Sequence, residues 1–259
     1  MYFCFMLIDT HTHLYVSEFD ADRSDMIKRA MDAGVEQFVL PAIDSETTAI
    51  MHSLKNDYPD SIHLMMGLHP THVGENLAEA LAHVQQQLAT HSFVAVGEIG
   101  MDLYWDKSFQ KEQQQAFAKQ IAWALDYNLP IVIHCREAFD EIFEVLEGVQ
   151  DKRLRGIFHC FTGDLSQAHR AIGFNMLLGI GGVVTFKNSG LAQTVAEIPL
   201  EHIVLETDAP YLAPMPFRGK RNESAYISHV AQKVALTHNV SLEQVSKQTT
   251  KNAKNLFGI

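Results

Sequence analysis

Short apolar runs, many of them rich in β-branched residues, alternate with longer amphipathic segments along the whole chain. Runs of this length and composition are typical of buried strands. Eight strands are predicted on this basis, at 5–9, 36–42, 62–68, 93–99, 130–135, 156–161, 175–181 and 202–207. The spacing of apolar positions between and after them predicts helices at 23–34, 110–128, 222–238 and 241–256.

The alternation of strand and helix predicts a parallel sheet built from βαβ units. Two architectures fit such units: a closed eight-stranded barrel and an open doubly wound sheet. The open sheet often binds nucleotides through a G-x-G-x-x-G turn after its first strand. Here the first strand is followed by DTHTHL instead. Eight units in 259 residues therefore favour a (β/α)8 TIM barrel.

The length would also allow two small domains, but nothing in the sequence marks a boundary between them. No Gly/Ser linker, Pro-rich tract, charge block or low-complexity stretch interrupts the chain. We therefore expect residues 1–259 to form a single barrel domain.

Ligand-type side chains recur at or just beyond the carboxyl ends of the predicted strands. They are His11, His13, His69, Glu98, His134, His159 and Asp208. In a barrel these strand ends converge on one mouth, which carries the active site in enzymes of this fold. A single histidine in such a place is usually a structural, hydrogen-bonded residue, but the joint pattern predicts a metal site.

The H-x-H motif is the strongest evidence in the sequence for a metal site. Side chains alternate along a strand, so His11 and His13 face the same way and can bind one cation. Four imidazoles and two carboxylates exceed the needs of one tetrahedral zinc. Because a carboxylate can bridge two ions, the set is rich enough for a two-metal centre. Such donors suit zinc, manganese, cobalt or nickel, whereas magnesium prefers oxygen ligands.

Charge limits the classes of partner. A formal net charge of −11 argues against broad coating of DNA or RNA, although an enzyme can still handle a nucleic-acid end at one cationic site. The segment 217–222, FRGKRN, supplies Arg218, Lys220 and Arg221 after the last strand, and Lys187 follows the seventh. These residues either receive a phosphate or form a solvated loop.

The remaining composition favours a cytoplasmic protein with no membrane association. Cys4, Cys135 and Cys160 form no C-x-x-C pair, and an odd count is a poor disulfide framework. We expect Cys135 and Cys160 to face the helical shell as buried apolar groups. The opening MYFCFMLI lacks the basic region and cleavage site of a signal peptide. No apolar run approaches the ~20 residues that cross a bilayer.

The motifs together resemble the TatD family of metal-dependent hydrolases. They are D-T-H-T-H at 9–13, G-L-H-P at 67–70, G-E-I-G-x-D at 97–102, I-H-C-R at 133–136, H-C-F-T-G at 159–163 and L-E-T-D-A-P at 205–210. The match runs over essentially the whole chain in family order. The resemblance implies a distorted amidohydrolase-type barrel and a divalent-metal-dependent deoxyribonuclease activity, which magnesium or manganese could support as well as zinc.

Carried over by position, the resemblance also implies roles for individual residues. His11, His13 and Asp208 would hold one ion, His134 and His159 the second, and Glu98 would bridge them. His69, Arg136 and Asp102 would lie in the substrate pocket. Ser224 and Leu103 depart from the family pattern, in the R-G-K-R-N-E loop and after Asp102. These departures affect the substrate details and leave the metal ligands intact.

The expected reaction is phosphodiester hydrolysis by a metal-activated water, with Asp208 orienting the water and accepting its proton. The expected substrate is a nucleic acid, as DNA ends or single strands, and no obligate protein partner is evident. Arg136 would grip a phosphate oxygen, and Arg218 and Arg221 would assist substrate capture. Glu206 could support a ligand or point into the barrel; Asp9 could orient a ligand or form a buried structural hydrogen bond.

Two other functions remain open. A barrel of this type can hydrolyse a C–N or ester bond of a small metabolite. Many such enzymes bridge their metals with a modified lysine on strand four, where this chain has Glu98. Alternatively, the protein binds metal without catalysis, which the intact Asp208 argues against.

Overall fold

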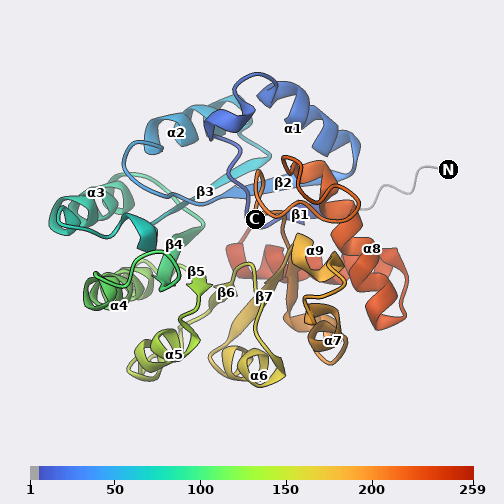
Figure 1. Cartoon of the computed structure of the whole chain (residues 1–259). Helices are drawn as coiled ribbons and strands as arrows, with labels where there is room; N and C mark the ends of the chain where they lie inside the picture. The colour runs from blue at the N-terminus through green and yellow to red at the C-terminus, as the bar shows by residue number, and fades with distance from the viewer. Residues whose placement is uncertain (1–5) are drawn as a thin grey trace.

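A computed structural model describes residues 6–259 and contains all eight predicted strands in one sheet (Figure 1). They are β1 (Leu7–Asp9), β2 (Val35–Leu40), β3 (Ile62–Met66), β4 (Ala95–Asp102), β5 (Ile131–Arg136), β6 (Gly156–Phe158), β7 (Met176–Ile180) and β8 (Ile203–Leu205). Neighbouring strands pair in parallel and in sequence order. Residue 5, where the first strand is predicted to begin, and Cys4 lie outside the described residues.

The sheet closes on itself between its first and last strands. The amide of Thr10 donates to the carbonyl of Leu205 at 3.1 Å, and the amide of Asp208 donates to the carbonyl of His11 at 2.9 Å. Register shifts within the β1–β2 and β4–β5 pairs, and strands of only three residues, make the barrel irregular. The predicted (β/α)8 barrel is confirmed, and the open-sheet alternative is wrong.

Helices form a ring around the strands (Figure 1). They are α1 (Arg23–Asp32), α2 (Thr48–Asp57), α3 (Leu77–Thr90), α4 (Gln110–Asp126), α5 (Phe139–Glu147), α6 (Leu165–Gly173), α7 (Leu191–Ala196), α8 (Ile227–His238) and α9 (Leu242–Phe257). The predicted helix 222–238 is shorter, because residues 224–226 form a separate 3-10 turn, η5. The strand and helix faces that meet are apolar, and this interface forms the larger core.

A second, smaller apolar cluster fills the barrel itself. Ile8, Val39, Met65 and Val132 come from four different strands, and Phe257 joins them from α9. Helix α9 begins at a capping box, in which Ser241 accepts from the amide of Gln244 at 3.2 Å. The last helix therefore closes one end of the barrel and leaves the other end for polar groups.

Two strands, β4 and β6, end three residues away from their predicted ends, and both differences matter for the polar groups. β4 runs on to Asp102, so Glu98 lies in the middle of a strand and not at its end. β6 stops at Phe158, so His159 follows the strand. No helix within residues 6–259 is long and apolar enough to cross a membrane.

Candidate metal centre

Six side chains that the sequence separates by up to 197 positions meet at one mouth of the barrel. His11 and His13 follow β1, Glu98 lies on β4, His134 on β5, His159 follows β6 and Asp208 follows β8. Three sets of donor atoms are close enough to hold a cation: His11, His13 and Asp208; His11, Glu98 and His159; and His69, Glu98 and His134. The fold thus brings together all six predicted ligands.

Glu98 lies at the centre of this cluster, and its two oxygens face different groups of imidazoles. Its Oε2 atom lies 3.1 Å from Nε2 of His11 and 3.8 Å from Nε2 of His13. Its Oε1 atom lies 2.8 Å from Nδ1 of His134 and 2.8 Å from Nε2 of His159. A carboxylate divided in this way can contact two cations at once.

Asp208 completes the group on the Oε2 side. Its Oδ1 atom lies 3.4 Å from Nε2 of His13 and 3.8 Å from Nε2 of His11. Asp208 has a positive φ of 57°, which directs its side chain back toward the histidines rather than along the strand. Burial raises its pKa, but hydrogen bonding to His13 and the charges of His159 and His11 hold the pKa below its ordinary value.

The donor set fits a divalent cation on chemical grounds. His11 Nε2 and Glu98 Oε2 are buried and lie 3.1 Å apart, and within residues 6–259 neither atom has a hydrogen-bond partner, so a cation could satisfy both. Burial raises the pKa of Glu98, but His159, His69 and His11 outweigh it and keep the pKa well below the ordinary value. A buried carboxylate that stays ionised among imidazoles is suited to bind a cation.

Several of the imidazoles have a polar group on the side that faces away from the centre. Nδ1 of His13 lies 2.9 Å from the hydroxyl of Tyr15, which donates its own proton to the carbonyl of Pro41 at 2.7 Å. The hydroxyl therefore accepts from Nδ1, and Nε2 keeps a lone pair directed at the centre. Tyr15 is not among the residues that the sequence predicts for the site.

Carboxylates support the two histidines on the other side. Asp102 Oδ2 lies 3.0 Å from Nε2 of His134, and Glu206 Oε1 lies 3.4 Å from Nδ1 of His159. Glu206 also accepts from the amide of Cys160 at 2.5 Å. Its carboxylate occupies the space beside Gly179, where a Cβ atom would collide with Oε2. Of the two roles open for Glu206, the structure favours ligand support.

His69 lies against the same centre as a hydrogen-bond donor. The amide of Thr71 donates to its Nδ1 atom at 3.2 Å, so the proton of the neutral ring is on Nε2. That atom lies 3.3 Å from Glu98 Oε1. Burial lowers the pKa of His69 to about 4, and the ring is neutral at pH 7. This tautomer distinguishes His69 from the predicted metal ligands, and its place in a substrate pocket stays a prediction.

The predicted substrate-binding arginines differ in whether a carboxylate already neutralises their charge. Arg136 stacks on the ring of Tyr104, with 3.8 Å between the guanidinium carbon and the ring centroid, and Arg218 stacks on Phe186 at 4.5 Å. Arg221 instead forms an ion pair with Asp22 at 2.7 Å. The guanidinium of Arg221 is therefore held at the start of α1 and does not point to the mouth, where substrate capture would need it.

Asp9 serves the closure of the barrel. Its carboxylate accepts from the amide of Thr207 at 2.9 Å and from the hydroxyl of the same residue at 2.5 Å. Burial raises the pKa of Asp9 to about 7. Of the two roles open for Asp9, these contacts favour the buried structural hydrogen bond.

Cys135 and Cys160 both have thiols whose pKa is raised, but they differ in backbone conformation. Cys135 packs against the outer core as predicted, and burial raises its pKa to about 12. Cys160 has a positive φ of 44°, so strand alternation does not fix its direction. Burial, together with Asp208 and Glu206, raises its pKa well above the ordinary value.

Three histidines on helices lie away from the centre, and each is either hydrogen-bonded or partly buried. His83 Nε2 lies 2.9 Å from the Thr48 hydroxyl, and His52 Nε2 lies 3.3 Å from the Gln87 carbonyl oxygen. His238 has a buried Nε2 atom. None of these contacts involves the candidate centre.

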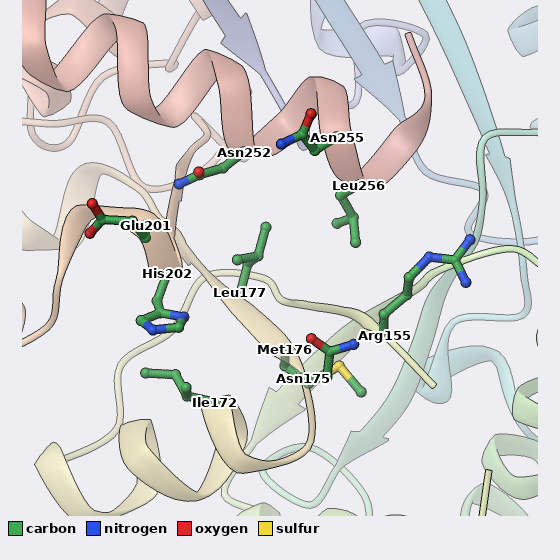
Figure 2. A pocket seen from close by; sticks show the side chains of 10 residues that line it. All are labelled: Arg155, Ile172, Asn175, Met176, Leu177, Glu201, His202, Asn252, Asn255 and Leu256. Carbon is green, nitrogen blue, oxygen red and sulfur yellow. The ribbon is translucent and has the colours of Figure 1, made fainter. Parts of the chain in front are cut away.

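A cavity of about 270 Å³ lies at the opposite end of the barrel (Figure 2). It is lined by residues that precede or begin β6, β7 and β8, and by α9: Arg155, Ile172, Asn175, Met176, Leu177, Glu201, His202, Asn252, Asn255 and Leu256. Its one histidine, His202, is in none of the three donor sets. Since the amino-terminal end of a TIM barrel serves stability, this cavity is not the candidate site.

The geometry agrees with comparisons to known proteins. The family model for TatD-related DNases matches residues 8–258. The chain belongs to the TatD family. It is a metal-dependent hydrolase of this family, whose fold gathers the donors described above.

Individual relatives cover nearly the entire chain. The uncharacterized metal-dependent hydrolase YabD of Bacillus subtilis (strain 168) is 39% identical, over 98% of this chain and 100% of YabD. The 3'-5' ssDNA/RNA exonuclease TatD of Pantoea ananatis (strain LMG 20103) is 31% identical over 98% and 100%. The crystal structure of the TatD homologue YjjV from Escherichia coli K12 superposes with a TM-score of 0.92 at 30% identity, over 98% of each chain.

Proposed function

We propose that this TatD-family hydrolase cleaves phosphodiester bonds of nucleic acid, as a deoxyribonuclease acting at unpaired ends, with two divalent metal ions. The main support for the proposal is that the two carboxylate oxygens of Glu98 face different groups of histidines. One carboxylate oxygen faces His11 and His13 and the other faces His134 and His159. This is the arrangement needed to share one ligand between two cations.

The residues that would hold the ions form two groups around Glu98. His11, His13 and Asp208 form the first, and His134 with His159 the second. Two bound ions would neutralise the charge of the phosphodiester and make a bound water a nucleophile near neutral pH. Mixed nitrogen and oxygen donors favour zinc or manganese, and magnesium is the oxygen-preferring alternative.

The chain's own groups supply proton transfer and binding. Asp208 is ionised, because the imidazoles lower its pKa, and its carboxylate takes the proton of the attacking water. The water oxygen bonds to phosphorus while one P–O bond of the ester breaks, and the leaving oxygen takes a proton from solvent. Nε2–H of His69 and the guanidinium of Arg136 bind the non-bridging oxygens.

Two observations support a nucleic-acid substrate over a small metabolite. A relative 31% identical to the chain is named a 3'-5' ssDNA/RNA exonuclease. On a chain of net charge −11, exposed cations nevertheless lie at the end of β5 and after β7 and β8: Arg136, Lys187, Arg218 and Lys220. A polyanion would meet these charges on approaching the mouth.

The test combines elemental analysis with nuclease assays on wild type, Glu98→Ala and Asp208→Ala. We expect both variants to lose activity on single-stranded DNA by at least about 100-fold, and Glu98→Ala to bind less metal. Glu201→Ala, which removes an exposed carboxylate at the opposite end, is the matched control. Full activity in both variants would refute the mechanism. Hydrolysis of amides or small esters without any phosphodiester cleavage would instead favour the metabolite hydrolase.

A further inference from the structure

Two exposed aromatic side chains lie beside the candidate metal centre, directly after β4. Tyr104 is 49% exposed and Trp105 is 69% exposed. Their rings meet edge to face, with centroids 4.8 Å apart. Large aromatic side chains left in solvent at the catalytic end of a barrel leave their π-faces available to a ligand.

The backbone of this aromatic pair is fixed to the metal centre by one carboxylate. Asp102 Oδ1 accepts from the amides of Tyr104 and Trp105 at 3.0 and 3.3 Å. The other oxygen, Oδ2, lies 3.0 Å from Nε2 of His134. Gln113 holds Asp102 in turn, because its carbonyl oxygen accepts from the Asp102 amide at 2.9 Å. The aromatic pair is therefore positioned relative to a predicted metal ligand.

A cation lies against the same rings. The guanidinium carbon of Arg136 is 3.8 Å from the Tyr104 centroid and 5.1 Å from the Trp105 centroid. Among residues 6–259, Arg136 forms no ion pair with a carboxylate; Asp102, its register partner on β4, is bonded to His134 instead. A charge held on aromatic faces, without an acidic partner, remains available to an anion.

We propose that Tyr104, Trp105 and Arg136 form a stacking platform for a nucleobase of an unpaired strand. The proposal rests on the proposed function and names the residues that select its substrate. Aromatic rings and Arg stack on any base that offers a free face, and the bases of a duplex already use theirs on each other. The platform therefore favours unpaired ends.

The position of the platform also sets which base it binds. His134 and Arg136 are two residues apart on β5, which is roughly 7 Å at about 3.3 Å per residue. A strand whose phosphate lies at the metal centre would place the base of the cleaved nucleotide, or of its neighbour, on the rings. The guanidinium of Arg136 then lies between the base and the phosphate.

The experiment moves one abasic site along a single-stranded DNA substrate and measures kcat and KM for wild type and Trp105→Ala. Stacking predicts that one abasic position near the cleaved end raises the wild-type KM about tenfold. Trp105→Ala should show the higher KM already with intact DNA and should not respond to that abasic position. Trp105→Phe should restore the response in part. Metal content should be equal in all variants.

Tyr127→Ala is the matched control, because Tyr127 is 43% exposed and follows α4 at the other end of the barrel. It should behave as wild type. Tryptophan fluorescence gives an independent measurement, since the other tryptophan, Trp123, is only 8% exposed. In the Asp208→Ala variant, intact oligonucleotide should quench the emission, and the abasic oligonucleotide should do so less.

Two results would overturn the platform while leaving the nuclease in place. One is a wild type that responds to no abasic position; the other is an identical response in wild type and Trp105→Ala. A metal-loaded wild type that cleaves no oligonucleotide would overturn the proposed function and the platform together.

Discussion

At the scale of single residues, the roles of three histidines at the centre follow from what their second nitrogen binds. Tyr15 fixes His13, and Asp102 lies at the far nitrogen of His134. The nitrogen of His69 that faces away from the centre accepts from the amide of Thr71. A neutral imidazole whose one nitrogen accepts a hydrogen bond carries its proton on the other nitrogen. Histidine can therefore be a metal ligand at one position and a hydrogen-bond donor at another.

His69→Ala should separate these two roles. Because its Nε2–H faces Glu98 and the ring is neutral, we expect the variant to retain its metal and to lose about 100-fold in kcat, as when one donor to a developing anion is removed. His134→Ala, which removes a predicted ligand, should lose metal as well. The measurements are elemental analysis and steady-state kinetics. Loss of metal from His69→Ala would make it a ligand and contradict the tautomer assignment.

The sequence predicts the ligands of this centre better than their supports. His11, His13 and Asp208 could be predicted because strand ends in a barrel converge whatever the loops do. Tyr15 could not, since its hydroxyl reaches His13 only through the turn of the chain after β1 and the carbonyl of Pro41. The engagement of Arg221 by Asp22 likewise depends on where a loop lies against α1.

At the scale of elements, ion pairs tie the loop after β8 to α1. Asp22 accepts from Arg221 at 2.7 and 2.8 Å and from Arg29 at 2.9 Å, and Arg29 also binds Glu223 at 2.7 Å. Hydrogen bonds from Arg221 and Arg29 hold the pKa of Asp22 well below its ordinary value. The loop that carries Arg218 to the mouth is therefore anchored at its far end.

Asp22→Asn should destabilise the protein in a pH-dependent manner. A carboxylate with a depressed folded pKa contributes stability above its unfolded pKa, near 3.8, and loses it as the pH falls through the folded value. We expect the variant to unfold with about 1 kcal/mol less free energy at pH 7, since the pair is partly exposed, and the difference to shrink below pH 4. Urea denaturation at both pH values measures this. Asp32→Asn, in the exposed pair with Lys28, should change nothing; a difference that grows on acidification would refute the assignment.

Helix α9 has its own energetic role, because it completes the core inside the barrel. Phe257 is 7% exposed and packs in the same cluster as Ile8 and Val204. Phe257→Ala should lower the free energy of unfolding by about 3 kcal/mol through lost burial and the cavity left behind. Leu236→Ala, at a side chain 78% exposed on α8, should be near neutral in the same denaturation experiment. Equal effects of the two substitutions would show that α9 does not close the core.

At the scale of the whole molecule, the barrel could be predicted because all eight strands carry an apolar signal of their own. The limits of β4 and β6 could not, since pairing with neighbours decides where a strand stops. Register pairing of β4 with β5 continues to Asp102 opposite Arg136, beyond the last apolar residue of the predicted strand. The pairing between strands, and not the sequence of any one strand, therefore decides where the polar mouth of the barrel begins. The single-domain organisation of residues 1–259 stays a prediction.

The metal should contribute to the stability of this whole arrangement. The donors come from or follow β1, β4, β5, β6 and β8, so bound cations would connect both sides of the barrel seam. A ligand present at 100 times its dissociation constant adds about 2.7 kcal/mol to the free energy of unfolding, which for a chain of this size corresponds to roughly 5–10 °C. Calorimetry before and after chelation, followed by readdition of zinc or manganese, should show this shift and its recovery. Glu98→Ala should show a much smaller one, because the ligand shared by both groups is gone. A wild-type melting temperature that chelation leaves unchanged would mean that the cluster at the mouth holds no ion.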